Sequence, residues 1–250
     1  MLDDVADGLK EPQRLSQQLT TLLAAEIVSG RLEPGSKFPS TEAIVTRFAV
    51  SRTVARETVQ GLAMLGLVSV QHGKRTEILP PEEWDILSST VQEALRREGR
   101  AEPLLHDLYE FRMLIEPHAA SLMARNATDA EVAELSRLAT EMEEIAASDG
   151  ATRSVLVADR EFHNLVARAG GNRVVLAVSR DIREILGTLW GYSKLGPAEL
   201  KDVARQHRKL ADAIGKRDGE AAAEAMREHL AWASQADLHD LRDSGAGAGG

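Results

Sequence analysis

Residues 39–70 read PSTEAIVTRFAVSRTVARETVQGLAMLGLVSV, and this stretch decides the fold of the N-terminal part of the chain. Ser40 is a candidate N-cap for a short helix whose inward face includes Ile44. The pattern then breaks, and Ser51 is a candidate N-cap for a second helix that runs to about Leu65. Two short helices joined by so tight a turn predict a helix-turn-helix.

The helix after Ser51 has two different faces. We expect Ala55, Val59 and Leu62 to be buried, because they share one side of a helix. The opposite side carries polar residues that can bond to base edges or to phosphates: Arg52, Thr53, Arg56 and Gln60. Arginine can donate two hydrogen bonds to guanine in the major groove. The pattern therefore indicates a DNA recognition helix, with a solvated basic face as the alternative.

The sequence on either side completes a small domain. Upstream, Leu19, Leu23 and Ile27 recur at four-residue spacing and predict a helix that Gly30 ends. Downstream, residues 67–70 and 75–78 predict two strands joined by a turn. Three helices and a hairpin within residues 10–80 predict a winged helix-turn-helix. The tip of the wing offers three candidates for contact with the minor groove: His72, Gly73 and Lys74.

Charge is distributed unevenly along the 250 residues. The whole chain has a net charge of −9, which by itself argues against nucleic-acid binding. Residues 10–80, however, hold nine lysines and arginines against six acids, so this segment is positive, while residues 81–250 carry −9. A mildly basic head on an acidic body is compatible with DNA binding by the head alone.

Everything after Pro80-Pro81 is predicted to be helical. The expected helices span 83–98, 104–126, 129–148, 152–169, 172–193, 197–216 and 219–241. Residues 128–131 have the capping-box pattern that starts a helix. The predicted fold class is thus mostly α, with a winged helix-turn-helix at 10–80, a linker helix at 81–98, an all-helical bundle at 99–241 and a disordered tail at 242–250. No apolar run is long enough to span a membrane, and the acidic N-terminus is no secretory signal, so we expect a cytoplasmic protein.

The helical part contains a candidate metal site. Asp159 and His163 lie four residues apart and share one face of a helix, while His207 and His229 lie on two later helices. Because the chain has no cysteine, any metal must have nitrogen and oxygen ligands. Three imidazoles and a carboxylate suit a divalent ion, with Zn²⁺ as the first candidate and Ni²⁺ or Mn²⁺ as others. The alternative is that these histidines are scattered and exposed.

The N-terminal motifs resemble the DNA-binding domain of GntR-type bacterial regulators over about residues 15–79. The resemblance rests on Gly30-x4-Gly35-x3-Pro39-Ser40, Val50-Ser51-Arg52-Thr53-x2-Arg56-Glu57 and Leu62-x3-Gly66-Leu67-Val68. It implies base contact by Arg52 and Arg56, with Ser51, Thr53 and the wing in support. Glu42 departs from the family, since some members have a DNA-binding arginine there, and this implies a different operator sequence.

The C-terminal part resembles the FCD domain of the FadR-like branch of that family over about residues 83–240. The motifs are Glu110-Phe111-Arg112-x3-Glu116-Pro117 and Asp159-x2-Phe162-His163-x8-Asn172. In metal-binding members, the ligands stand at the positions of Asp159, His163, His207 and His229. The resemblance also implies that Arg112 binds a carboxylate effector, the alternative being a structural ion pair with Glu116.

These observations predict a regulator of transcription, not an enzyme. We expect a repressor of a catabolic operon that binds a palindromic double-stranded DNA operator as a homodimer and senses a small organic acid at the metal. Residues 79–87 resemble the linker of sugar-acid-responsive members, which makes a sugar acid the first candidate. Two alternatives remain open: a metal-dependent hydrolase with a fused helical head, and a DNA-binding protein without effector.

Overall fold

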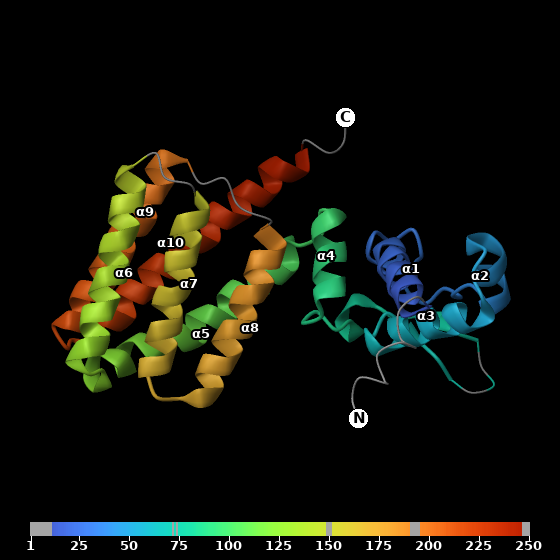
Figure 1. Ribbon diagram of the computed structural model, residues 1–250, viewed down its shortest axis with the longest axis horizontal. Coiled ribbons are helices and arrows are strands. Elements are labelled where there is room, and N and C mark those ends of the chain that lie inside the picture. Colours follow the sequence, from blue (N-terminus) through green and yellow to red (C-terminus); the bar gives the residue numbers. More distant parts are fainter. Residues whose placement is uncertain (1–11, 72, 74, 149–151, 191–195, 247–250) are drawn as a thin grey trace, which may run out of the picture. The chain divides into compact units, whose positions relative to one another are not determined.

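A computed structural model describes residues 12–71, 73, 75–148, 152–190 and 196–246. The chain divides into two compact units, Met1–Ala101 and Glu102–Gly250 (Figure 1). The first unit holds both strands, and the described part of the second contains helices only. The prediction of a mostly α protein is therefore confirmed.

The N-terminal unit contains the expected three helices and hairpin, followed by a fourth helix. In chain order its elements are α1 (Pro12–Val28), α2 (Thr41–Phe48), α3 (Arg52–Met64), β1 (Val68–Ser69), β2 (Glu77–Ile78) and α4 (Ser89–Arg97). The two strands pair antiparallel. They are shorter than the predicted 67–70 and 75–78. Residues 76–78 also bond on their other side to residues 35–38. The winged helix-turn-helix prediction is confirmed.

Both predicted serine caps are present in this unit. The side chain of Ser40 accepts a hydrogen bond from the N–H of Ala43, and that of Ser51 accepts one from the N–H of Val54. Between these helices Ala49 adopts a left-handed conformation with φ of 52°, which ends α2 and turns the chain into α3. Each cap satisfies a backbone donor that the first helical turn leaves free.

The predicted apolar face of α3 was partly wrong. Ala55 and Leu62 are buried as expected, but Val59 is only half-buried, and Val54 and Thr58 complete the buried face instead. Thr58 tolerates burial because its hydroxyl donates to the carbonyl of Val54 at 2.8 Å. The buried stripe is therefore rotated by about one residue, and it packs against α1.

The predicted helix at 83–98 was also wrong in its first half. A short 3-10 helix, η2 (Pro81–Glu83), comes first, and α4 begins only at Ser89, capped by the side chain of Ser88. The backbone at Trp84 is extended, and the N–H of Asp85 donates to the carbonyl of Leu65 at the end of α3. These contacts hold residues 84–88 out of a helix. They also place the predicted linker, 81–98, in the first compact unit.

The C-terminal unit is a bundle of helices (Figure 1). Its elements are α5 (Glu102–Asn126), α6 (Asp129–Ala147), α7 (Thr152–Ala169), α8 (Arg173–Trp190), α9 (Pro197–Gly215) and α10 (Gly219–Ala246). The capping box is confirmed, since Thr128 and Glu131 bond to each other's backbone N–H. α10 packs along α5 and α9, and α6 packs along α9 and α7. No described helix combines the length and the apolar character that a membrane span requires.

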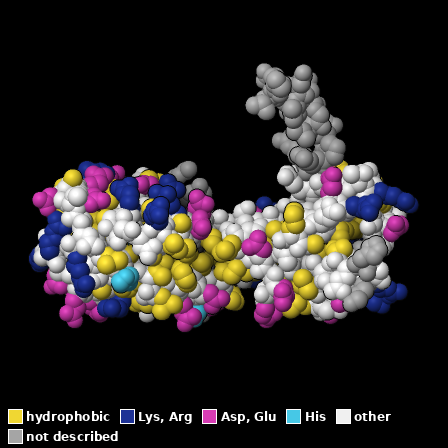
Figure 2. Space-filling view, turned by 90° about the horizontal axis from the view of Figure 1, so that it is seen from below, with side chains coloured by type: hydrophobic (Ala, Val, Ile, Leu, Met, Phe, Trp, Pro, Cys, Tyr) yellow, Lys and Arg dark blue, Asp and Glu magenta, His cyan; other side chains and the backbone are white. Residues whose placement is uncertain are grey.

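The surface of this unit includes hydrophobic side chains. Figure 2 shows a group of them gathered on one face of the unit. On α5, Phe111 and Leu114 are exposed, and on the adjoining α8 Val174 is exposed. Groups of exposed apolar side chains commonly mark an interaction surface.

The expectation of a disordered tail at 242–250 is corrected for its first part. α10 continues to Ala246, beyond the predicted end of the helix at residue 241. A helix already anchored by its earlier turns can add residues at one hydrogen bond each, so these residues need no packing partner to continue it. Residues 247–250 lie outside the described part of the chain.

Replacing Gly66 by Ala should destabilise the N-terminal unit strongly. Gly66 has φ of +68°, and an added Cβ would overlap the backbone carbonyl oxygen of Glu83. We expect a loss of about 2–4 kcal/mol in the free energy of unfolding, measured by chemical denaturation. Gly35→Ala is the control, because Gly35 also has a positive φ but nothing lies within 4 Å of the added Cβ. Equal losses in both variants would show that the contact with Glu83 is unimportant.

Candidate metal centre and nucleic-acid interface

α3 presents the predicted DNA-binding residues to solvent. Arg52, Thr53 and Arg56 are all exposed, and neither arginine forms an ion pair with any described residue. Ser51 is exposed as well, but its hydroxyl oxygen already accepts the N–H of Val54 as the helix cap. Since the partial positive charge of the helix N-terminus adds to Arg52, this end of α3 is suited to contact an anionic backbone and base edges.

The predicted wing is described only in part. Gly73 is exposed and has φ of +75°, a conformation that allows a tight turn at the tip of the hairpin. His72 and Lys74 lie outside the described residues. Their proposed contact with the minor groove therefore stays a prediction.

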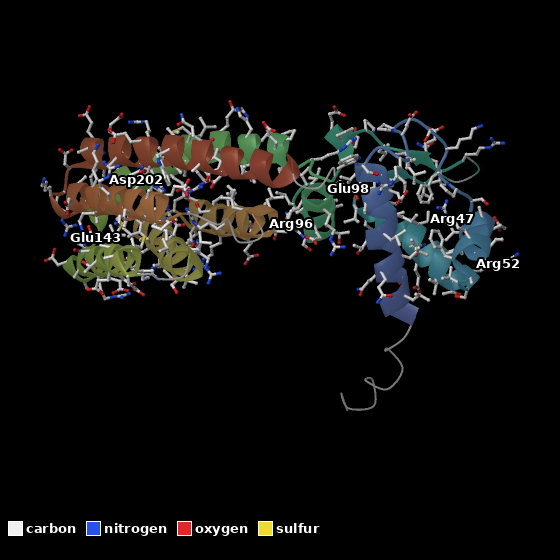
Figure 3. The ribbon with its side chains drawn as sticks, turned by 90° about the horizontal axis from the view of Figure 1, so that it is seen from above. Arg47, Arg52, Arg96, Glu98, Glu143 and Asp202 are labelled. Atoms are coloured by element: carbon white, nitrogen blue, oxygen red, sulfur yellow. The ribbon has the colours of Figure 1, made fainter. Side chains whose placement is uncertain are left out.

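One basic residue near this face escaped the sequence analysis. Arg47, in the last turn of α2, is exposed, and its guanidinium lies 5.6 Å from the ring centre of Phe48. Figure 3 shows Arg47 and Arg52 in the helix-turn-helix part of the first unit. The sequence held a signal for it, because Arg47 lies in the last turn of the predicted helix that directly precedes the recognition helix.

The four predicted metal ligands come together in the core of the C-terminal unit. Asp159 and His163 are on α7, His207 is on α9 and His229 is on α10, and one donor atom from each lies within 4.8 Å of all the others. Nε2 of His163 lies 3.1 Å from Nε2 of His229 and 3.3 Å from Nε2 of His207. Oδ1 of Asp159 lies 3.1 Å from Nε2 of His207. The alternative, that these histidines are scattered and exposed, is therefore wrong.

These distances fit the size of a transition-metal site. With metal–ligand bonds of about 2.0–2.1 Å, two ligand atoms in a tetrahedral zinc site lie about 3.3 Å apart. The observed separations of 3.1–3.3 Å match that spacing, and the pair His163 Nε2–Asp159 Oδ1 is somewhat wider at 3.6 Å. The donor set of three nitrogens and one oxygen therefore fits a divalent ion in both type and position.

The outer nitrogen of each imidazole faces an acceptor. Nδ1 of His207 lies 2.8 Å from the carbonyl oxygen of Val203, and Nδ1 of His229 lies 3.2 Å from Oε1 of Gln206. Nδ1 of His163 lies 2.9 Å from Oε2 of Glu116. With the proton on each Nδ1, all three Nε2 lone pairs point at one another, an arrangement that is repulsive without a cation. This orientation is the strongest structural indication of a metal centre.

The surroundings of His163, His229 and Asp159 keep these three ligands in the forms that bind metal. It lowers the pKa of His163 to about 4, an effect to which Arg183 adds, and it lowers the pKa of His229 well below its usual value. Burial alone would raise the pKa of Asp159, but His163 and His207 outweigh it and hold that pKa below the usual range. At neutral pH His163 and His229 are thus neutral and Asp159 is ionised, the forms in which such groups bind metal.

Arg112 lies beside the metal ligand Asp159. It also forms the ion pair with Glu116 that the sequence analysis gave as the alternative to effector binding. Its Nε donates to Oε1 of Glu116 at 2.7 Å, both side chains are buried, and its guanidinium lies 4.9 Å from the ring centre of Tyr109. Arg112 nevertheless lines a pocket of about 460 Å³ together with the ligand Asp159. An ion pair and a contact with a bound acid are therefore compatible.

Two residues of this centre escaped the sequence analysis. Arg183 on α8 is buried and donates through Nη2 to Oε1 of Glu116 at 2.9 Å, and Gln206 faces His229. Arg183 had a signal, because it lies on the apolar side of α8, where Ile182 and Leu186 are buried. The sequence held no such signal for Gln206, because its neighbours Arg205 and His207 are also polar.

The remaining described histidines do not join the centre. His106 and His118 are exposed. His106 lies 3.9 Å from Asp107, and with Glu110 the two form a second group of potential ligands, but all three are exposed. The side chain of His239 lies outside the described residues.

The first unit is a winged helix-turn-helix, and the second is a helical unit with a buried set of potential metal ligands. This combination is typical of DNA-binding regulators that carry a sensory domain. The family models place the chain within this class. Residues 15–78 match the model of bacterial regulatory proteins, gntR family, and residues 107–231 match the model of the FCD domain. The chain belongs to the GntR family and carries an FCD domain. It is a transcriptional regulator, not an enzyme, so the hydrolase alternative is excluded.

Curated relatives match along most of the chain. The galactonate operon transcriptional repressor of Escherichia coli K12 is 25% identical over 217 residues, covering 86% of this chain and 93% of that protein. The regulator LutR of Bacillus subtilis 168 is 29% identical, covering 82% and 92%, and the repressor NanR of Enterobacter sp. 638 is 27% identical, covering 87% and 83%. Among solved structures, a GntR protein of Streptococcus agalactiae has the same fold, with 24% identity, a TM-score of 0.50 and coverage of 88% and 99%.

Gln206→Ala should lower the affinity for Zn²⁺ by about 10–100-fold, because His229 loses the acceptor that orients its ring. The measurement is competition with a coloured chelator of known affinity. Gln235→Ala serves as the control, since Gln235 is exposed on α10. If both variants retain the affinity of the wild type, Gln206 does not position His229.

Proposed function

We propose that this chain is a ligand-responsive repressor of a catabolic operon. It acts in the cytoplasm and binds a palindromic operator as a homodimer, through Ser51, Arg52, Thr53, Arg56 and the wing residues His72, Gly73 and Lys74. It senses a small carboxylate at a divalent ion held by Asp159, His163, His207 and His229, with Arg112 beside it. Zn²⁺ is the first candidate for the ion, and a sugar acid is the first candidate for the effector.

The convergence of three Nε2 atoms and a carboxylate in the second unit carries this proposal. Burying three imidazoles and a carboxylate costs stability that an apolar core would not lose. A DNA-binding protein without effector would gain nothing in return for that cost. The centre adjoins a pocket of about 460 Å³, a size that suits a small metabolite. The names of the relatives, which include a galactonate operon repressor, support a sugar acid.

When bound, the ion supplies a Lewis-acidic position for an oxygen of the effector. The protein contributes the orientation of the ligands and, through Arg112, a positive charge for a carboxylate. An effector of this kind changes operator affinity only by binding more tightly to one arrangement of the dimer than to another.

A homodimer is supported by the exposed apolar side chains of the second unit. Leu114 on α5 is 77% exposed and Val174 on α8 is 70% exposed. The dimer places two recognition helices on half-sites about one turn of DNA apart, as operators of this class require.

Arg52→Ala should weaken binding to operator DNA by about 10–100-fold, because one bidentate base contact is worth about 1–3 kcal/mol. The measurement is fluorescence anisotropy with DNA from the region upstream of the chain's own gene. Arg97→Ala, on α4 of the same unit, removes an equal charge from an exposed side chain and should bind like the wild type. Unchanged binding of Arg52→Ala would refute the assignment of the reading face.

Leu114→Arg should shift the protein from dimer towards monomer, because it introduces charge into the proposed interface. Light scattering after size-exclusion chromatography gives the mass directly. Glu144→Arg on α6 is the matched control, since Glu144 is also exposed and lies on another helix. A Leu114→Arg protein that remains a dimer places the interface elsewhere.

A further inference from the structure

The basic side chains of the N-terminal unit differ in whether an acid neutralises them. Just after α1 and on α4, ion pairs with glutamates engage Arg31, Arg96 and Arg97, and Arg100 beyond α4 has none among the described residues. On the helix-turn-helix and the wing, no cation whose side chain is described forms an ion pair. These exposed residues are Lys37, Arg47, Arg52, Arg56 and Arg75. Cations left free on one part of a surface are typical of a nucleic-acid footprint.

Two of these cations lie outside the recognition helix, on elements that pack against it. Both α2 and β1 pack on α3, and β1 pairs with β2. Figure 1 shows α2 above α3 and the hairpin below it, and Figure 2 shows lysines and arginines at the end of the unit that carries α2. A helix about 10–12 Å wide fills the major groove, which is about 12 Å wide, so a phosphate backbone runs along each side of it. Elements that flank such a helix therefore lie over phosphates.

Arg47 lies on the packed side of α2. Ile44 is the buried residue of this helix, and Arg47 follows it by three residues, so the two are neighbours on the helix surface. Glu42 precedes Ile44 by two residues and therefore lies on another side of the helix, away from Arg47. The guanidinium of Arg47 lies 5.6 Å from the ring centre of the half-buried Phe48. This cation–π contact holds the guanidinium in place and leaves its N–H groups free to donate.

Arg75 occupies the corresponding place on the hairpin. It is exposed and lies two residues before β2, and the carbonyl of the next residue, Thr76, accepts the N–H of Phe38 at 2.9 Å. This bond fixes the backbone beside Arg75. The first acid after it in the sequence, Glu77, lies opposite Lys37 on the neighbouring segment. Lys37 therefore offsets the charge of Glu77, and the charge of Arg75 remains available for an anion.

We propose that Arg47 and Arg75 bind backbone phosphates on the two sides of the major groove that α3 enters. This inference rests on the proposed function and extends it, because it separates two roles among the arginines of the head. Arg52 and Arg56 read bases, whereas Arg47 and Arg75 position the head on any duplex, since phosphates carry no sequence information. Each phosphate contact releases condensed counterions, so it adds to the salt dependence of the affinity.

The test measures the salt dependence of DNA binding by the full-length protein and its variants. Fluorescence anisotropy gives the association constant for two labelled duplexes of equal length, one from the region upstream of the chain's own gene and one of random sequence. For Arg47→Gln and for Arg75→Gln, the slope of log K against log salt concentration should become shallower by about 0.9 for each bound head, or about 1.8 for a dimer. The affinity should fall by the same factor on both duplexes, because the lost contact is not to a base.

Arg97→Gln is the matched control, because Arg97 is an exposed arginine of the same unit whose charge Glu93 offsets. It should keep both the affinity and the slope of the wild type. Arg52→Ala is the opposite control, and it should weaken binding to the upstream duplex more than to the random one. Arg47→Lys and Arg75→Lys keep the charge and should keep the wild-type slope. Thermal melting of each variant reports whether it is folded.

Two results would overturn the inference. One is an unchanged slope for the folded Arg47→Gln and Arg75→Gln proteins, and a change in only one of them overturns the assignment of the other residue. The second is a loss of affinity confined to the upstream duplex, which would make these residues base readers. Equal affinity of the wild type for the two duplexes counts against the proposed operator instead, and the slopes on the random duplex still test the phosphate contacts.

Discussion

The carboxylate of Glu116 is the constraint on which the centre of the helical unit depends. One oxygen accepts from Arg112 on its own helix and from Arg183 on α8, and the other faces Nδ1 of His163 on α7. Burial alone would raise the pKa of Glu116, but Arg112 and Arg183 outweigh it and hold that pKa well below its usual value. A single ionised carboxylate thus fixes three helices and the tautomer of a metal ligand, in the way a carboxylate behind a ligating histidine usually does.

The same arrangement explains why charged groups occupy a core that apolar residues could fill more cheaply. Replacing a buried ion pair by hydrophobic residues is often neutral or stabilising, so stability alone does not account for Arg112, Glu116 and Arg183. Their position between the histidines and the pocket gives them a use, because they set the charge that a bound molecule meets. Tyr109, whose hydroxyl bonds to the buried Asp237, extends this polar core towards α10.

Much of the fold could be predicted from local signals in the sequence. The caps at Ser40, Ser51 and Thr128 are interactions between residues three apart, so the sequence contains both partners. α4 also has a local cap at Ser88, but the extended stretch before it has no local signal. That stretch is held by the bond from the N–H of Asp85 to the carbonyl of Leu65, 20 positions away in the sequence.

In the candidate site, too, partners that are close in sequence could be predicted and distant partners could not. Asp159 and His163 are four residues apart on α7 and could be paired from spacing alone, whereas placing His207 and His229 beside them required the family resemblance. Arg183 was missed because a charged residue inside an apolar helix face has no local partner. Glu116, its partner, is 67 positions away.

The charge distribution bears on how such a regulator can be switched. The head from 10 to 80 has only a small positive charge, and the rest of the chain is acidic. Few phosphate contacts mean a small gain from counterion release, so affinity must come from base contacts and from engaging two half-sites together. A dimer that depends on both heads loses much of its affinity when one head is displaced. In the proposed regulator, a coupling free energy of about 1–3 kcal/mol between effector and operator is then sufficient for control.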